Sequence, residues 1–367
     1  MIWLSLIAFL TAALVAGAII RFARHHARQY GHDMPQRFHH GHVPRLGGLA
    51  IVFGMGLSWL LGIASTLWDD PASLRMGEWA VFWFIALLPS ACGGIAEDIT
   101  QRLSVRYRLL LTALSGLLAV LLLQLRVTEL DIPWIDQYLL QPLPWLGIGI
   151  ALLAVAGLPH AFNIIDGYNG LAGMVALIIC LALAHVALQV GDRTLAALLL
   201  STAAATGGFL LWNYPKGLLF AGDGGAYIWG TVIAMACLYL VQRNAGISPW
   251  FPVLLLIYPI WETCFSAYRK LARGISPGVA DALHFHQLIY RRIVRRTFDE
   301  DIARRMLKRN NRTSPYLWAF ALFTVVPAVI FRGNTVVLIA LTLLFIVCYV
   351  LAYLAIIRFK VPGWFQP

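Results

Sequence analysis

Apolar runs of about twenty residues recur along the whole chain, and this repetition constrains its fold more than any single motif does. A helix needs about 20 apolar residues to cross ~30 Å of hydrocarbon. Hydrophobic residues make up 60% of the 367 residues and charged residues 12%, which is far from the composition of a soluble globular protein. The sequence therefore predicts an all-α, polytopic integral membrane protein that forms one domain over 1–367. Its expected spans number about eleven, at 1–20, 46–67, 78–95, 107–125, 145–161, 170–190, 194–212, 225–241, 249–267, 316–331 and 335–357.

Lysine and arginine are distributed unevenly between the loops. Of the 28 in the chain, 23 fall on one side of the alternating spans, and twelve of these lie in the late loop 268–315. The positive-inside rule places that side in the cytoplasm, with the N-terminus outside and the C-terminus cytoplasmic. The net charge of +11 then reflects loops that face anionic membrane lipid. No basic groove motif or aromatic platform accompanies it, so nucleic acid is not an expected partner.

Three acidic clusters interrupt the apolar background on the predicted cytoplasmic side. They are Glu97-Asp98, the stretch Asn-Ile-Ile-Asp-Gly-Tyr-Asn-Gly-Leu at 163–171, and the glycine-flanked Asp223 at 222–225. A charged side chain near hydrocarbon costs several kcal/mol unless it is paired or solvated, so the clusters predict a site. Each also has a simpler interpretation: the aspartates can cap helices, and the acidic pair, with Arg102, Arg106 and Arg108 after it, can be a solvated charge run. The grouping of all three on one side of the membrane favours the site.

The residue types indicate magnesium and phosphoryl transfer. Carboxylates without a neighbouring group of cysteines or histidines suit a hard cation held by one or two protein oxygens and by substrate phosphates. The backbone around Asp223 carries almost no side chains, so a metal-bound phosphate can approach it closely. Such a site is typical of phosphoryl transfer, where the metal and basic side chains offset the charge of a diphosphate.

Two basic stretches supply further polar groups. One leads into the second span as His-His-Gly-His-Val-Pro-Arg-Leu-Gly-Gly, at 39–48, and includes Arg45. The other contains His284 and His286, followed by the pair Arg291-Arg292. Histidines spaced by one beside paired arginines suggest a grip on a phosphate or nucleotide. For 291–312, a basic amphipathic helix on anionic lipid headgroups is an equally open interpretation.

The order of these motifs resembles the polyprenyl-phosphate N-acetylhexosamine-1-phosphate transferases. The shared order is Pro-Arg-x-Gly-Gly, an acidic pair after a span, Phe-Asn-x-x-Asp-Gly-x-x-Gly-Leu, Gly-Asp-x-Gly, and His-x-His in a late basic loop, over about 35–292. The resemblance implies an Mg²⁺-dependent enzyme of the bacterial inner membrane with its active site facing the cytoplasm. The implied reaction transfers a sugar 1-phosphate from a UDP-N-acetylhexosamine to undecaprenyl phosphate and releases UMP.

The resemblance also implies a role for each matching residue. Asp223 is the expected metal ligand together with Asp166, and Asn163 helps to hold the nucleotide. The acidic pair Glu97 and Asp98 is expected to handle the lipid phosphate, and Glu97, Asp98 and Asp166 are the expected catalytic residues. The substrate phosphates are expected to contact the histidines and two arginines, which are His284, His286, Arg291 and Arg45.

Four positions depart from the family pattern. Glu97 replaces the usual first aspartate of the acidic pair, and Asn169 stands where a second aspartate is usual. Glu262 occupies a position where aspartate is common, and Gln287 one where another histidine is frequent. The long histidine block of the peptidoglycan translocase is missing, which favours the branch that initiates O-antigen or exopolysaccharide, with roles in lipopolysaccharide biosynthesis and cell wall biogenesis.

Two other functions remain open from the sequence. A transporter or flippase for a lipid-linked solute would place its polar residues near the bilayer midplane, whereas the polar residues here are expected at one border. A catalytically inactive relative is the other alternative, because Glu97 and Asn169 depart from the pattern. The sequence does not name the sugar or the pathway, and a homodimer is an open alternative to a monomer.

Overall fold

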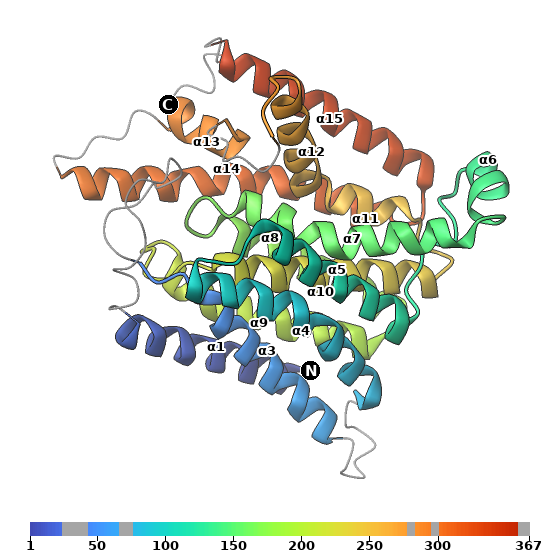
Figure 1. Ribbon diagram of the computed structural model, residues 1–367, viewed down its shortest axis with the longest axis horizontal. Helices are drawn as coiled ribbons and strands as arrows, with labels where there is room; N and C mark the ends of the chain where they lie inside the picture. The colour runs from blue at the N-terminus through green and yellow to red at the C-terminus, as the bar shows by residue number, and fades with distance from the viewer. Residues whose placement is uncertain (24–42, 66–75, 277–282, 295–300, 359–367) are drawn as a thin grey trace.

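The all-α architecture is confirmed in a computed structural model, which describes residues 1–23, 43–65, 76–276, 283–294 and 301–358 (Figure 1). These residues contain no β-strand. Ten of their helices are long and apolar enough to cross a membrane. They are α1 (Ile2–Phe22), α3 (Gly47–Ala64), α4 (Gly77–Thr100), α5 (Val105–Leu123), α7 (Pro144–Ile165), α8 (Leu171–Gln189), α9 (Arg193–Asn213), α10 (Gly222–Arg243), α14 (Ile302–Ile330) and α15 (Thr335–Ile357).

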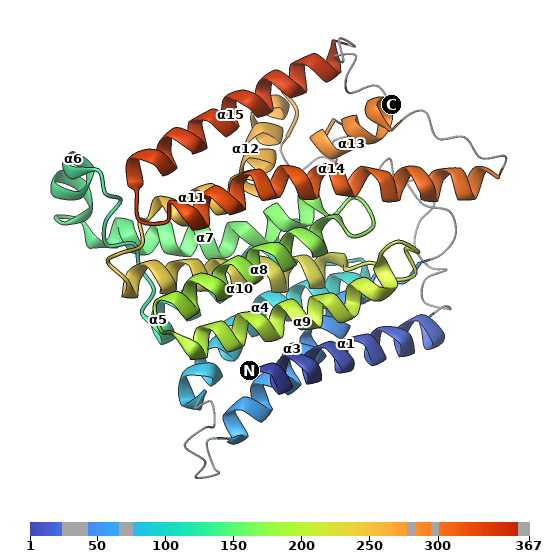
Figure 2. The ribbon, with the colours of Figure 1, turned by 180° about the vertical axis from the view of Figure 1, so that it is seen from behind.

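Helix α10 lies at the centre of the bundle. It packs against α3, α4, α7 and α8, and buried residues occupy nearly its whole length. Helices α1 and α3 lie at one edge of the bundle, and α14 and α15 lie at the other (Figures 1 and 2). Because neighbouring helices cover every face of α10, the position of its first turn is fixed by the bundle as a whole.

The expected span at 249–267 forms two helices, α11 (Trp250–Leu255) and α12 (Ile257–Leu271). Pro259 has no N–H to donate to the carbonyl four residues earlier, and the chain leaves helical geometry at Leu256 (φ −105°, ψ 6°). Helix α12 crosses the other long helices steeply in both views (Figures 1 and 2). This break explains why ten helices qualify as spans where about eleven were expected, and it gives α12 a different direction from the other long helices.

Helix α14 begins much earlier than the span expected at 316–331. Its first residue is Ile302, and the Asp301 side chain accepts hydrogen bonds from the backbone N–H groups of Ala303 and Arg304. Aspartate is a favoured residue at this capping position. The basic stretch that sequence placed in the loop 268–315 is therefore partly the first half of a membrane helix.

Short helices complete the chain at the two ends of the bundle. At one end, α6 (Pro133–Ile135) and η2 (Asp136–Leu140) lie between α5 and α7. At the other end, α13 (Phe285–Leu288) and η3 (Ile289–Ile293) precede α14. The end of α15 lies at the same end of the bundle as α13, opposite to the start of α1 (Figure 1).

Two glycines let α3 and α4 approach the first turn of α10 closely. A Cβ atom on Gly48 would lie 2.5 Å from the backbone of Gly224, and one on Gly94 would lie 2.7 Å from the backbone of Asp223. Both distances are well inside van der Waals contact. Backbone hydrogen bonds from Gly47 and Gly48 to the carbonyls of Phe220 and Ala221 tie the start of α3 to the same place.

Candidate active site

Asp223 forms the centre of a group of polar side chains at one end of the bundle. It lies in the first turn of α10 and is 6% exposed. Its Oδ1 accepts a hydrogen bond of 2.8 Å from Nδ2 of Asn163, at the end of α7, and its Oδ2 accepts one from Nη1 of Arg108, on α5. Three helices that are distant in sequence thus converge on one carboxylate. The guanidinium offsets the negative charge, and this compensation allows a carboxylate to be buried here.

Asp98 binds the backbone at the N-terminus of α10. Its two carboxylate oxygens accept hydrogen bonds from the backbone N–H groups of Asp223 (2.9 Å) and Gly224 (2.8 Å). A carboxylate is favoured at a helix N-terminus, where these N–H groups have no partner within the helix. Gly222, which has a φ of +69°, makes room for this contact, because a Cβ there would collide with both Asp98 oxygens. In this position Asp98 fixes the backbone that carries Asp223.

Glu97 points to a different contact. Its Oε2 accepts a hydrogen bond of 2.7 Å from the backbone N–H of Leu103, in the loop before α5. Gln101 closes α4 in a left-handed conformation (φ 52°) and donates to the carbonyl of Glu97. Glu97 therefore shapes the short connection that places Arg108 beside Asp223.

A second layer of side chains supports the Asp223 group one helical turn deeper. Thr112 follows Arg108 by four residues, Tyr227 follows Asp223 by four, and His160 precedes Asn163 by three. Residues at these spacings lie on the same face of a helix. The imidazole of His160 bridges the other two, at 3.2 Å from Thr112 Oγ1 and 3.3 Å from the Tyr227 hydroxyl. This layer fixes the three helices that carry the inner group.

Asp166 ends α7 and lies close enough to interact electrostatically with Asp223. The pKa of Asp166 is raised to about 7, chiefly by burial; Arg45 opposes the rise, and the negative charge of Asp223 adds to it. Arg45 itself is exposed. Its segment pairs with the chain before α10 through the hydrogen bond from Phe220 N to Pro44 O. The structure thus brings Asp166, Arg45 and Asp223, three of the predicted site residues, into one electrostatic neighbourhood. Residues 39–42 lie outside the described residues.

The late histidines join this end of the bundle through α12. His284 Nδ1 lies 3.0 Å from Glu262 Oε1, and Glu262 also accepts hydrogen bonds from the backbone of Phe285 (3.1 Å) and the hydroxyl of Tyr349 (2.8 Å). Glu262 is completely buried. A buried carboxylate is stabilised only when its lone pairs are satisfied, and here three donors do so. Glu262 consequently fixes the orientation of the His284 ring.

His286 lies against the turn that follows Asp166. Its ring is stacked on that of His284, with centroids 5.3 Å apart, and meets the ring of Tyr168 edge-on at 5.6 Å. A Cβ on Gly167 would lie 2.8 Å from Nε2 of His286, so only glycine leaves space for the imidazole. Arg291 is exposed on η3, and its charge opposes the rise in the Tyr168 pKa that burial causes. The histidine motif and the Asp166 turn are therefore neighbours.

Sequence reasoning missed several members of this group. It treated Arg108 as part of a charge run with Arg102 and Arg106, and it named neither His160 nor Tyr227. Arg108 and Thr112 are four residues apart, as are Asp223 and Tyr227, and this spacing could have indicated that each pair lies on one helix face. Glu262 was noted only as a departure from a pattern, although a glutamate in an apolar stretch indicates a buried partner.

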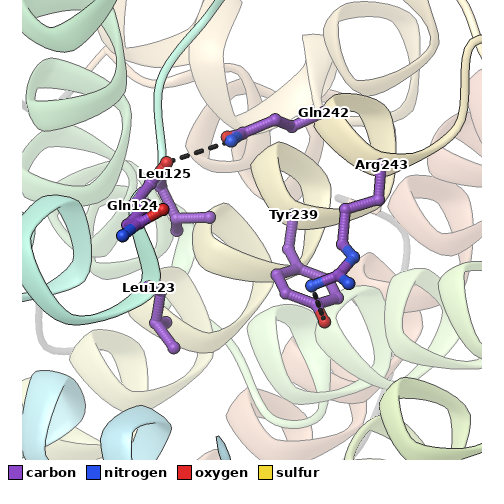
Figure 3. A pocket seen from close by; sticks show the side chains of 6 residues that line it. All are labelled: Leu123, Gln124, Leu125, Tyr239, Gln242 and Arg243. Carbon is purple, nitrogen blue, oxygen red and sulfur yellow. Dashed lines mark hydrogen bonds between the residues drawn. The ribbon is translucent and has the colours of Figure 1, made fainter.

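A cavity elsewhere in the protein is separate from this group. It has a volume of about 320 Å³ and lies at the far end of α10, where Gln242 faces the segment after α5 and Arg243 lies against Tyr239 (Figure 3). Gln242 donates to the carbonyl of Gln124, and Arg243 donates to the hydroxyl of Tyr239. At 1.5 Å per residue, roughly 24 Å of helix separates Tyr239 from Asp223. The cavity contributes nothing to the polar group around Asp223.

Comparison with known proteins supports the family that the motifs indicated. The model of glycosyl transferase family 4 matches residues 79–241, a stretch that runs from α4 to the end of α10 and includes Asp98, Asp166 and Asp223. This stretch of the chain is similar to the family. The family 4 match ends before His284 and His286, which lie in the region that the structure joins to the site.

Similar proteins cover most of the chain. A probable undecaprenyl-phosphate N-acetylglucosaminyl 1-phosphate transferase of Bacillus subtilis is 28% identical over 284 residues, which is 76% of this chain and 75% of the relative. An undecaprenyl-phosphate alpha-N-acetylglucosaminyl 1-phosphate transferase of Escherichia coli is 27% identical over 281 residues, covering 74% and 72%. A phospho-N-acetylmuramoyl-pentapeptide-transferase of Clostridium perfringens is 25% identical over 292 residues, covering 77% and 87%. The resemblance drawn from the motifs is confirmed.

Proposed function

We propose that this protein transfers an N-acetylhexosamine 1-phosphate from a UDP-sugar to undecaprenyl phosphate and releases UMP. The observation that carries the proposal is the convergence of the acidic residues on α4, α7 and α10 with the histidines beside α13. The names of the relatives support the same class of reaction. The absence of the long histidine block favours the branch that starts an O-antigen or exopolysaccharide.

Magnesium fits the donor set. Mg²⁺ needs one or two carboxylates, with substrate phosphates and water as its other ligands. Asp223 and Asp166 supply two carboxylates that interact electrostatically, and the Asn163 amide can present its oxygen if it turns. Among the residues that the structure describes, no three His, Cys, Asp or Glu side chains gather into a metal cluster, so substrate phosphates would complete the coordination. When bound, Mg²⁺ would offset the negative charge of the diphosphate.

In the proposed reaction, an oxygen of undecaprenyl phosphate bonds to the phosphorus attached to the sugar. The bond from that phosphorus to the bridging oxygen of the diphosphate breaks, and this oxygen leaves with UMP. Negative charge shifts onto UMP during the step. Donors that are already oriented stabilise such charge most effectively, and His284 is oriented by Glu262. We assign His284 and His286 to the diphosphate, together with Arg291 and Arg45.

Asp98 and Asn163 prepare the site in this proposal. Asp98 fixes the backbone of α10, and Asn163 orients the carboxylate of Asp223. The predicted role of Glu97 and Asp98 in handling the lipid phosphate remains a prediction. We place the protein in the bacterial inner membrane with this end of the bundle in the cytoplasm, because UDP-sugars are cytoplasmic donors and the basic loops lie at this end.

The activity can be tested with purified protein in lipid nanodiscs. Undecaprenyl phosphate, Mg²⁺ and a panel of UDP-N-acetylhexosamines would be supplied, UMP release measured, and the lipid product identified by mass spectrometry. We expect UMP and a sugar-diphospho-lipid in equal amounts with at least one donor, and neither product with Asp223→Asn. Transport of a preformed lipid-linked sugar without UMP release would favour the flippase alternative, and inactivity with every donor would favour an inactive relative.

A further inference from the structure

The first half of α14 contacts two separate loops of the proposed site. This part of the helix carries Arg309, Asn310 and Asn311, on the basic stretch for which the sequence left lipid anchoring open, and Ser314 just beyond it. Asn310 and Ser314 are buried. A segment that served only to bind lipid headgroups would direct its polar side chains outward. Four of these polar side chains instead point into the protein.

Three of them hold Asn169, in the turn after Asp166. Asn310 Oδ1 accepts a hydrogen bond of 2.8 Å from the backbone N–H of Asn169. Asn311 Oδ1 accepts one of 3.0 Å from the Asn169 side-chain amide, and Ser314 Oγ donates one of 2.6 Å to the Asn169 carbonyl. The backbone of one turn residue is thereby satisfied on both sides by a single helix. The contact from Asn169 Nδ2 requires a donor, which an aspartate at this position would not supply.

Arg309 holds the histidine segment. Its Nη2 donates a hydrogen bond of 2.8 Å to the carbonyl of Tyr290, and its guanidinium lies 4.3 Å from the centre of the Tyr290 ring. The Tyr290 ring stacks on Tyr168 at 5.2 Å, and Tyr168 in turn meets His286 edge-on. A cation over an aromatic face at this distance is favourable. Arg309 is therefore connected through aromatic rings to His286 and to the turn after Asp166.

We propose that Arg309, Asn310, Asn311 and Ser314 form a clamp that sets the Asp166 turn and the His286 segment at a fixed separation, which makes Arg309 and Asn311 positioning residues for the transfer reaction. The effect of the clamp on the rate of transfer rests on the proposed function. A displacement of about 1 Å between catalytic groups can cost on the order of a hundredfold in rate. The two loops carry groups assigned to the metal and to the diphosphate, so their separation determines how both ends of the donor are held.

The first test compares Arg309→Ala with Arg305→Ala. Arg305 lies one turn earlier on α14 and is exposed, so its removal deletes the same charge from the same helix without touching the clamp. We expect Arg309→Ala to lower kcat by tenfold or more and Arg305→Ala to change it by less than about twofold, since an exposed charge contributes little. Arg309→Lys keeps the cation over Tyr290 and should recover part of the loss. Equal kcat values for the two alanine variants would overturn the proposal.

A double-mutant cycle tests whether Arg309 acts through Tyr290. If it does, Arg309→Ala and Tyr290→Leu should cost less together than the product of their separate losses in kcat. A purely structural role would lower the amount of folded protein and leave kcat per folded molecule unchanged.

For the amide contacts, Asn169→Asp combined with Asn311→Asp places two carboxylates where a hydrogen bond of 3.0 Å now lies. The loss from this pair should exceed the product of the single losses, and additivity would contradict the contact.

Hydrogen exchange separates the clamp from the reaction itself. In nanodiscs without substrate, Arg309→Ala should speed amide exchange in both 166–170 and 286–293, whereas Arg305→Ala should not. Unchanged exchange in both segments would refute the clamp whether or not the protein releases UMP. Faster exchange in a wild-type-active protein would support it, and faster exchange in a protein that releases no UMP with any donor would support the clamp and refute the proposed function.

Discussion

Replacement of Asp98 by asparagine tests how a carboxylate bound to the N-terminus of α10 contributes to activity. Asp98 uses two oxygens to accept from the N–H groups of Asp223 and Gly224. Asparagine has one oxygen, and its NH₂ group would face an N–H donor, so at least one charge-assisted hydrogen bond is lost. Such a bond contributes about 1.5 to 3 kcal/mol. If the loss appears in the transition state, kcat should fall by about ten- to 150-fold, because 1.36 kcal/mol corresponds to a factor of ten.

The chain contains a matched control for this change. Asp136, at the other end of the bundle, also accepts from two backbone N–H groups, those of Leu130 (2.7 Å) and Ile132 (3.0 Å). Asp136→Asn deletes the same kind of contact far from Asp223 and should leave kcat within about twofold. UMP release per folded molecule in nanodiscs measures both variants. Similar kcat values for the two would refute the positional argument. Complete loss of turnover in Asp98→Asn with normal α10 exchange would instead assign Asp98 the direct chemical role that the sequence predicted.

Four further outcomes are expected. Asp223→Asn should lower UMP release to below a tenth of the wild-type rate at saturating Mg²⁺, as measured by the same assay, because the anionic metal ligand is lost. Glu262→Gln should lower kcat by about tenfold, because it weakens the charge-assisted bond that orients His284; an unchanged kcat would contradict that orientation role. The pKa of Asp166 is raised to about 7, so its carboxyl gains a proton as the pH falls below 7. Titrations with Mg²⁺ should therefore show a weaker apparent affinity at pH 6 than at pH 8. Equal affinities at the two pH values would exclude Asp166 as a ligand. A cysteine placed at Arg305 should resist an impermeant thiol reagent in intact cells and react in inverted vesicles; the reverse pattern would overturn the predicted orientation.

The sequence predicted the spans well because the length and apolarity of a membrane helix are local properties. It failed at 249–267, a mostly apolar stretch in which the break depends on where Pro259 interrupts the hydrogen bonds of one helix. It also placed the beginning of α14 too late, because arginines and asparagines there lower the hydropathy although they continue the helix. The helical spacing between the asparagines of that stretch and Ser314 predicts the start of the helix better than the average polarity of the stretch does.

The site was predictable as a set of polar residues but not as a set of contacts. Asp98, Asp166 and Asp223 could be named because each interrupts an apolar stretch. Their division of labour depends on distances between helices far apart in sequence, which no local pattern contains. Arg108 illustrates the point, since in the sequence it is one arginine among three, and only the approach of α5 to α10 distinguishes it.

The glycines beneath the first turn of α10 have a consequence for the way variants of this protein would behave in a genetic selection. A methyl group at Gly48 or Gly94 would have to widen a gap of 2.5 or 2.7 Å toward roughly 3.5 Å. Asp223 would move by on the order of 1 Å, a shift large enough to impair catalysis. Positions 48, 94 and 222 should therefore score as intolerant as the acidic residues themselves, although none of these glycines has a side chain with which to touch a substrate. A map of sensitive positions would accordingly outline the packing around α10 as well as the chemistry at its tip.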